Sequence, residues 1–376
     1  MRRFGVLVAV LLMLSACSGA AAPPPNHAAR KTPSTPTPSP TPTPVPQLTL
    51  SGLFHPAGRA PTGPDVRTLN ATGDVIPARL VNEAGVDRND FEWPFRPTAS
   101  YVANADLTYI NLESPLLAGC QVTEVGLDFC GDPRWTEGLK AIGTDVANLA
   151  NNHVYPGPNT QATSRLLQAN GIQVTTNLGP PVVMNVRGTR FAFVACNAVE
   201  DGPVNRAALV ADIRAARRLV PAGVVVVQFH WGKEYERLPM PAPGLAPDSP
   251  VDLGHLAIDA GADLVLGNHP HWVQAVEIYK NHLIVYAHGN YVFDQVNCYP
   301  AIGPDYATYC SDDTRTSVIG TYTFHGTHLV GVTWKPTYTD TQLQTQFADP
   351  ARAATVLQTM EQASDQLARQ LGEPVS

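Results

Sequence analysis

The feature that most constrains the fold of this chain is a set of five apolar, strand-like runs that each end in a polar side chain. Helix-like segments separate the runs, and this alternation is typical of layered α/β folds. In an open α/β sheet, ligands bind beyond the carboxyl ends of the strands. We therefore expect the five ends to meet at one edge of a sheet, and they carry Asp74, Glu113, Asn152 with His153, His230, and His269 with His271.

The last of these ends, in GADLVLGNHPHWVQ (residues 261–274), has two imidazoles one residue apart. Pro270 disfavours the helical region for His269, and in an extended segment side chains two apart point to the same side. The sequence thus predicts that His269 and His271 face one site, with Gly267 giving the backbone room to turn. A single histidine at such an end is more often a loop residue with satisfied hydrogen bonds. Five such ends together favour a metal site.

The mixture of imidazole, carboxylate and amide side chains indicates which cation would bind. Such a set suits Mn, Fe or Zn, whereas structural zinc usually has a closed shell rich in thiolates. We expect one or two divalent ions.

The N-terminal residues predict export. Arg2 and Arg3 precede an apolar stretch over residues 4–13 and then LSAC, which resembles the lipobox of bacterial lipoproteins. The stretch is too short to span a bilayer as a mature helix. We expect residues 1–17 to be a signal peptide, Cys17 to carry the lipid, and the protein to be extracytoplasmic and anchored to the bacterial cell membrane. The alternative is an ordinary cleaved signal with an incidental cysteine.

The next segment, residues 18–64, alternates proline with threonine and serine, which predicts a solvated, semi-rigid linker. Residues 65–376 are expected to form one α/β domain with long loops. The formal net charge is −7 and there is no Lys/Arg run, which argues against nucleic acid as a partner.

Export also predicts oxidised cysteines. The pairs Cys120 with Cys130 and Cys298 with Cys310 each flank a short loop-like stretch, where a local disulfide is expected. Cys196, in FAFVACNA, is expected to be a buried free thiol. Cysteine metal ligands are the weaker alternative, because no CxxC spacing is present. Gly-x-Ser-x-Gly, P-loop and dinucleotide fingerprints are absent as well, which excludes the corresponding chemistries.

Six motifs resemble the CapA family of capsule-synthesis proteins, which is associated with poly-γ-glutamate. They span residues 68–294 in the order TGDVIPAR, DLTYINLESPL, LANNH, FHWGKEY, GADLVLGNHPHWVQ and LIVYAHGNYVFD. That family resembles a divergent branch of the calcineurin-like metallophosphoesterases. The resemblance implies a four-layered α/β/β/α sandwich like that of metallo-dependent phosphatases, with a two-metal site.

The resemblance also implies roles for the ligands. Glu113 would bridge two metals, Asp74 and His271 would complete one shell, and Asn152, His230 and His269 would complete the other. His153 would protonate a leaving group or steady the transition state. Two departures leave the number of ions open: Ile76 stands where such enzymes usually have a histidine, and the bridging residue is a glutamate instead of an aspartate.

Four further residues have two interpretations each. Arg79 would pair with a phosphate or carboxylate of the substrate, or form a structural salt bridge. Glu234 would act in acid–base chemistry or orient His230. Asn290 would bind a ligand or hold a turn, and His288 is expected to be a packing or surface residue.

Two functions fit these expectations. The first is a metal-dependent hydrolase or transferase acting on a phosphoester, or on an amide of an anionic cell-envelope polymer such as poly-γ-glutamate. The second is a non-catalytic assembly or export factor that holds the growing polymer or a membrane partner such as a polymer synthase. A surface lipoprotein without a site would leave the five strand ends unexplained.

Overall fold

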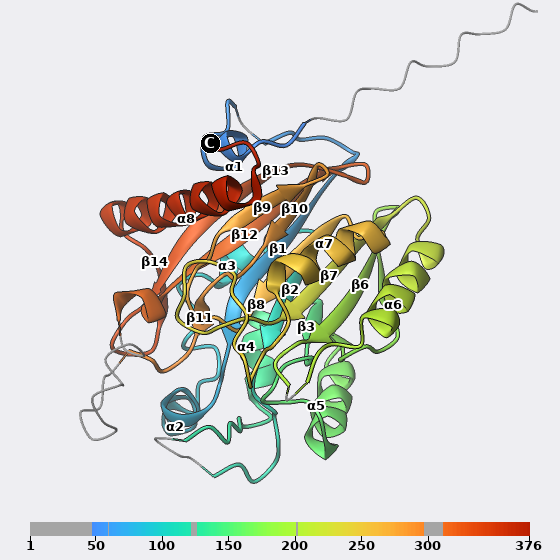
Figure 1. Cartoon of the computed structure of the whole chain (residues 1–376). Coiled ribbons are helices and arrows are strands. Elements are labelled where there is room, and N and C mark those ends of the chain that lie inside the picture. Colours follow the sequence, from blue (N-terminus) through green and yellow to red (C-terminus); the bar gives the residue numbers. More distant parts are fainter. Residues whose placement is uncertain (1–46, 59, 122–125, 201, 297–310) are drawn as a thin grey trace, which may run out of the picture. The chain divides into compact units, whose positions relative to one another are not determined.

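Two β-sheets pack face to face in the computed structural model, which describes residues 47–58, 60–121, 126–200, 202–296 and 311–376 (Figure 1). Within these residues one sheet has eight strands and the other six. The first sheet has the spatial order β14 (Thr345–Phe347), β13 (His328–Thr339), β12 (Thr316–His325), β1 (Val66–Val75), β2 (Leu107–Leu112), β3 (Val146–Asn148) and β4 (Gln173–Thr175), with β11 (Asn290–Val292) paired to β1. The second has the order β5 (Val182–Val186), β6 (Thr189–Asn197), β7 (Val224–His230), β8 (Leu264–Asn268), β10 (His282–Val285) and β9 (Val276–Tyr279).

In the first sheet β1 to β4 are parallel and β12 to β14 are antiparallel. In the second sheet β6, β7, β8 and β10 are parallel, and the edge strands β5 and β9 are antiparallel. Parallel strands are covered on both faces, which explains apolar runs such as VVVVQFH in β7. Alternate residues of that run divide between two clusters: Val226 packs between the sheets, whereas Val227 and Phe229 face the outer helices. The inner cluster joins the sheets, and Tyr109 of β2 stacks on Phe193 of β6 with ring centroids 5.1 Å apart.

Helices cover both outer faces, which confirms the expected α/β/β/α sandwich. The outer face of the first sheet packs against α2 (Arg79–Arg88), α4 (Trp135–Ala141) and α5 (Pro158–Ala169), and that of the second against α6 (Arg206–Leu219) and α7 (Pro250–Ala260). The remaining helical elements are α1 (Leu50–Phe54), α3 (Ala99–Val102), η3 (Asp312–Arg315) and α8 (Pro350–Leu371). Helix α8 contacts β13 of one sheet and β9 of the other, so it closes the side of the sandwich. Among the described helices, none has the length and apolarity needed to cross a membrane.

The folded domain begins earlier than residue 65, the boundary expected from the sequence. Helix α1 lies within the segment assigned to the linker, and its N-cap Thr49 accepts a hydrogen bond from the Gly52 amide at 3.0 Å. Leu50 and Leu53 are buried in the inner core, and Trp334 Nε1 donates to the Leu53 carbonyl at 3.1 Å. These leucines follow the run in which proline alternates with threonine and serine, which ends at Pro46, and they have enough apolar surface to dock.

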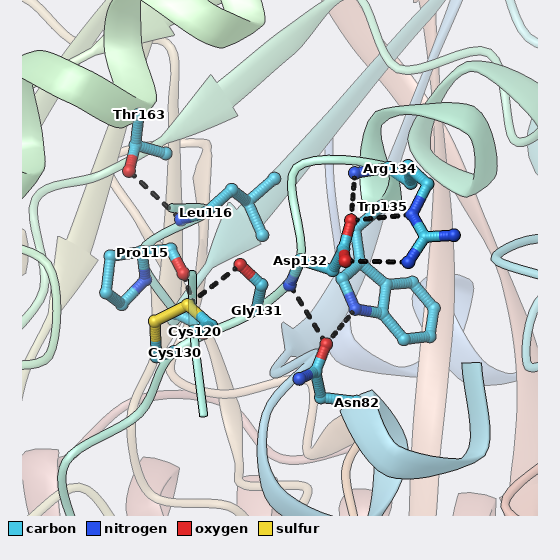
Figure 2. The surroundings of a disulfide bond; sticks show 11 residues. Asn82, Pro115, Leu116, Cys120, Cys130, Gly131, Asp132, Arg134, Trp135 and Thr163 are labelled. Atoms are coloured by element: carbon cyan, nitrogen blue, oxygen red, sulfur yellow. Dashed lines mark hydrogen bonds and ion pairs between the residues drawn. A yellow bond between two sulfur atoms is a disulfide. The ribbon is translucent and has the colours of Figure 1, made fainter. Parts of the chain in front are cut away.

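The structure bears on three of the six cysteines. Cys120 and Cys130 form the expected disulfide, with their Cα atoms 5.7 Å apart (Figure 2). Cys196 in β6 is a buried free thiol, also as expected. Cys17, Cys298 and Cys310 lie outside the described residues, as do the signal peptide and most of the linker.

We predict that Leu53→Ala lowers the free energy of unfolding by about 3 kcal/mol, because it removes a fully packed side chain from the core. Urea denaturation of the full chain measures the change. Ser51→Ala, at an exposed position of the same helix, is the control and should stay within about 0.5 kcal/mol of wild type. Equal stability of both variants would contradict the placement of α1 in the domain.

Candidate metal centre

The five strand ends meet at one edge of the sandwich, as the sequence predicts. Three overlapping groups of side chains could each hold a cation, because within each group the ligand atoms lie within 4.8 Å of one another. The groups are Asp74, Glu113 and His271; Glu113, His230 and His269; and Glu234, His269 and His271. Except for Glu234, all of these side chains are buried. The closest approaches run from 3.4 Å, between Asp74 Oδ2 and His271 Nδ1, to 3.9 Å, between Glu234 Oε1 and His271 Nε2. Such a set can enclose a cation.

A bulge aims Asp74 into this space. Leu69 and Ala71 of β1 face the inner core, so strict alternation would turn Asp74 outward. The pairing with β2 instead shifts between Ala71 and Asp74, where β1 has one extra residue. Val75 then joins the outer cluster and Asp74 faces inward, beside Asn111.

Several buried polar atoms of the cluster lack a hydrogen bond within the described part of the chain. They are Asp74 Oδ2, Glu113 Oε1, and both ring nitrogens of His269. A buried polar atom without a partner costs about 1–3 kcal/mol, and more when it is charged. Neutral His269 has a lone pair on one ring nitrogen and a hydrogen on the other, so one of its nitrogens and the two carboxylate oxygens are lone-pair donors, and these converge. The donor set therefore fits a divalent cation, which would satisfy them together.

The electrostatics of the cluster also suit a cation. Burial lowers the pKa of His230 to about 3 and takes the pKa of His269 well below its usual value, so both imidazoles are neutral near pH 7. Neutral imidazole is the ligand form. Burial, with the charges of Asp74 and Glu234, raises the pKa of Glu113 well above its ordinary range. A bound cation would reverse this effect, because it favours the carboxylate.

At Asp74 and His271, neighbouring charges and hydrogen bonds outweigh the effect of burial on the pKa. Burial raises the pKa of Asp74, but the hydrogen bond and charge of His271 outweigh it, and the net shift is downward. Burial lowers the pKa of His271, but Asp74 and Glu234 outweigh it, and the net shift is upward. Without a metal, a proton on His271 thus supplies positive charge beside Asp74.

Asn111 holds the cluster together, and the sequence analysis missed it. Its Nδ2 donates to Asp74 Oδ1 at 2.8 Å and to Glu113 Oε2 at 3.3 Å. Its Oδ1 accepts from Asn148 Nδ2 at 2.9 Å, which fixes the orientation of the amide. The signal was present in NLE, because residues two apart in a strand share a face and Asn111 therefore accompanies Glu113.

His269 and His271 face one site, but not through the extended backbone that we expected. Strand β8 ends at Asn268, and φ is +99° at His269 and +59° at His271. Positive φ values at non-glycine residues store strain and are found at functional sites. Here the tight path after the strand brings both rings back over the sheet edge.

Gly267 also has a role different from the expected one. It lies inside β8, and a Cβ there would come within 2.0 Å of the Tyr286 carbonyl oxygen and 2.5 Å of Trp231 Nε1. Glycine is needed for this close approach and not for a turn. The neighbouring Trp231 is core packing, since it stacks on Phe229 with ring centroids 4.4 Å apart.

Asn290 holds a ligand candidate in place. Its Oδ1 accepts a hydrogen bond from His271 Nδ1 at 2.9 Å. Its Nδ2 donates to the Thr314 carbonyl oxygen at 2.9 Å and to Gln295 Oε1, which fixes the amide. Partners of this kind orient metal-binding histidines.

Glu234 does not orient His230, which was one of its two interpretations. Its Oε1 lies 3.8 Å from His269 Nε2 and 3.9 Å from His271 Nε2. The side chain is 31% exposed, so it borders the solvent side of the cluster. Glu234 is therefore a further ligand candidate.

Arg79 forms the structural salt bridge, the second of its two interpretations. It is buried, and its Nε donates to Asp294 Oδ2 at 3.0 Å while Nη2 donates to Asp294 Oδ1. Its Nη1 donates to the Gly126 carbonyl oxygen at 3.1 Å. The assignment of Arg79 as a catalytic residue is therefore not supported, because Asp294 takes the bidentate face of the guanidinium.

His153 and Asn152 face the cluster from the loop after β3. Without a cation, His230 Nε2 donates to Asn152 Oδ1 at 2.8 Å, and both atoms can act as ligands once the ring hydrogen moves to Nδ1. His153 Nε2 lies 3.8 Å from Glu113 Oε1. Burial lowers the pKa of His153 to about 4, so its ring is neutral near pH 7.

Comparisons with known proteins confirm the family that the six sequence motifs indicate. The family model described as bacterial capsule synthesis protein PGA_cap matches residues 68–295. Capsule biosynthesis protein CapA of Bacillus anthracis is 30% identical over 254 residues, 61% of this chain and 60% of the relative. PGA biosynthesis protein CapA of Bacillus subtilis is 43% identical over 74 residues, 20% of this chain and 18% of the relative.

A third relative is a probable polyglutamine synthesis accessory protein of Mycobacterium tuberculosis, 28% identical over 260 residues, 60% of this chain and 66% of the relative. The chain thus spans less than two thirds of the length of each of these relatives.

We predict that Asn111→Ala weakens metal binding about 10–100-fold, because Asp74 and Glu113 lose their common donor. Isothermal titration of chelator-treated protein with Mn²⁺ or Zn²⁺ measures the affinity. Asn70→Ala is the matched control. Like Asn111, Asn70 is a buried strand residue, but it lies in β1 and its side chain donates to the Val102 carbonyl oxygen. Unchanged affinity in Asn111→Ala would contradict the role of this amide.

We also predict that His288 makes stability depend on pH. The ring is buried between the Gly267 carbonyl oxygen (3.2 Å) and Tyr322 Oη (2.7 Å), as expected for a packing residue, and burial lowers its pKa to about 4. The unfolded state takes up the proton near pH 6.5 and the folded state does not, so this contribution is complete above pH 6.5 and declines as the pH falls.

The expected loss between pH 7 and pH 5 is about 2 kcal/mol from this residue. Urea denaturation at both pH values, compared with His288→Gln, measures it. The stability difference between the two proteins should shrink at pH 5. A constant difference would contradict the prediction.

Proposed function

Because this chain belongs to the bacterial capsule synthesis protein family PGA_cap, we propose that it is a metal-dependent hydrolase or transferase of cell-envelope polymer synthesis. The observation that carries the proposal is the group of lone-pair donors without hydrogen bonds in the described residues, which three of the five strand ends bring to one place. Structural packing alone leaves these atoms unsatisfied.

The residues present would divide the work as follows. Glu113 belongs to two of the three overlapping groups, so it would bridge two ions or hold one centrally. Asp74 and His271 lie on one side of it, and His230 and His269 on the other, with Asn152 beside His230. A bound divalent cation would polarise a phosphoryl or carbonyl group and make a water molecule more acidic.

The remaining polar groups would handle protons and orientation. His153 holds its Nε2 toward Glu113 and would exchange a proton with the nucleophile or the leaving group. Asn111 and Asn290 keep Asp74 and His271 in position. Glu234, on the solvent side, is the group that an entering substrate would meet first.

The substrate follows from the family and from the chemistry of the site. The relatives are described as proteins of capsule, PGA or polyglutamine synthesis. We infer a phosphoester or amide bond in poly-γ-glutamate or another anionic envelope polymer as the target. With a net charge of −7, the chain would rely on the cation to attract a polyanion.

The proposed location is outside the cytoplasm, with the protein attached to the bacterial cell membrane through a lipid on Cys17. The lipobox-like LSAC and the proline-rich segment that follows support this arrangement. A polymer synthase in the same membrane is the partner that we propose, and nucleic acid is not.

We predict that His230→Ala reduces turnover of p-nitrophenyl phosphate or of poly-γ-glutamate by about 100-fold or more, because the variant lacks a buried ligand. Elemental analysis of the same samples should show less bound metal. Thermal unfolding of the chelator-treated variant should remain close to that of the chelator-treated wild type.

His325→Ala is the control, because His325 is exposed at the end of β12. Full activity of His230→Ala would refute the catalytic role. Wild-type protein that binds a stoichiometric metal but turns over neither substrate would instead favour a non-catalytic assembly or export factor.

A further inference from the structure

Residues 126–130, here called the wall, lie beside the metal centre, because Phe129 and the Leu127 carbonyl group contact His153. The wall ends at Cys130, which is bonded to Cys120 (Figure 2). Phe129 is buried, whereas the Leu127 side chain is 76% exposed. An exposed leucine in this place has no packing role, but its backbone carbonyl points to His153. The wall therefore contacts His153, the residue proposed to exchange protons in the site.

Three sets of contacts tie the wall down. Cys130 is bonded to Cys120, and next to it the Gly131 amide donates to the Pro115 carbonyl oxygen at 2.8 Å. Beyond that point, the Asp132 amide donates to Asn82 Oδ1 at 2.9 Å (Figure 2). At the other end, Arg79 donates to the Gly126 carbonyl oxygen.

Arg79 also packs against two aromatic rings beside the metal centre. Its guanidinium carbon lies 5.1 Å from the Phe129 ring centroid and 4.8 Å from the Phe293 centroid. Phe293 in turn lies 5.6 Å from the His271 ring. The salt bridge with Asp294 is thus a buried clamp behind two aromatic rings, which themselves line the site.

Two contacts determine the placement of His153. Its ring stacks on Phe129, with centroids 4.0 Å apart and planes 24° apart. Its Nδ1 lies 3.0 Å from the Leu127 carbonyl oxygen. Because a carbonyl oxygen only accepts, Nδ1 carries the hydrogen, and Nε2 keeps its lone pair toward Glu113.

We propose that Phe129 and the Leu127 carbonyl group, held by the Cys120–Cys130 disulfide and by Arg79, are positioning elements that fix both the tautomer and the direction of His153. This inference rests on the proposed function for its consequence in catalysis. Its structural part concerns only the state of one imidazole.

The stacked ring and the carbonyl group act on different degrees of freedom. Stacking restricts the tilt of the imidazole, while the hydrogen bond selects one of two ring flips and one tautomer. Loss of the Phe129 ring would free the tilt and weaken the hydrogen bond. A catalytic group misplaced by about 1 Å can lose a factor of 100 in rate.

The test compares three full-length proteins: wild type, Phe129→Leu and Leu127→Ala. Nitrogen-15 NMR of the histidine rings in chelator-treated protein reports the tautomer of His153. We expect one Nδ1-protonated form in wild type and a mixture in Phe129→Leu. With metal restored, kcat of Phe129→Leu should fall roughly 10–100-fold, and KM should stay within about twofold.

Leu127→Ala is the matched control, because it keeps the carbonyl group and removes only an exposed side chain. It should match wild type in both measurements. If Phe129→Leu fails to fold, wild type with its disulfide reduced replaces it, and the same mixture of tautomers is expected.

An unchanged single tautomer in Phe129→Leu, or in the reduced protein, overturns the inference whatever the activity. Absence of turnover in metal-loaded wild type refutes the proposed function alone, since the tautomer comparison does not depend on it. A tautomer mixture with unchanged kcat overturns the positioning role in catalysis.

Discussion

The burial of two neighbouring carboxyl groups, Asp74 and Glu113, is the constraint on which the site depends. Neither side chain has more than about 1% of its surface exposed, and each keeps one oxygen without a hydrogen bond among the described residues. Removing a charge from water costs several kcal/mol unless opposite charge compensates it. In the protein alone, the surroundings raise the pKa of Glu113 and of His271, which favours the protonated forms and reduces this cost. A cation would replace both protons, which makes metal binding dependent on pH and links it to the stability of the fold.

The fold supplies this constraint through strand geometry. Parallel strands of both sheets run to the same edge, so their last side chains face each other across the gap between the sheets. Alternation places His230 on the inner face of β7, two residues after Gln228. At Asp74, however, alternation fails, and the bulge in β1 corrects the direction of the side chain. The site is therefore the product of regular strands at most positions and of one irregularity at the carboxylate that needs it.

This division explains how much the sequence could predict. Apolar runs ending in polar residues are a local pattern, and from it a layered α/β fold and the meeting of Asp74, Glu113, His230 and His269 could be inferred. The four-layered sandwich followed from the resemblance to the family. Contacts between distant segments leave no such pattern. That Asp294 would take the guanidinium of Arg79, or that Asn111 would donate to Asp74, depends on strand register and loop paths. The path after β8 was mispredicted because it rested on the backbone preference before Pro270 alone, whereas φ is positive at both His269 and His271.

The position of Glu234 bears on how many ions the centre would hold. By resemblance to metallophosphoesterases, Ile76 stands where one shell would have an imidazole, so that shell has fewer ligands. Glu234 lies beside His271, the histidine of that same shell, and also beside His269 of the other. A carboxylate there would give that shell a further oxygen ligand. Glu234, from the loop after β7, would therefore offset the imidazole that is absent at Ile76.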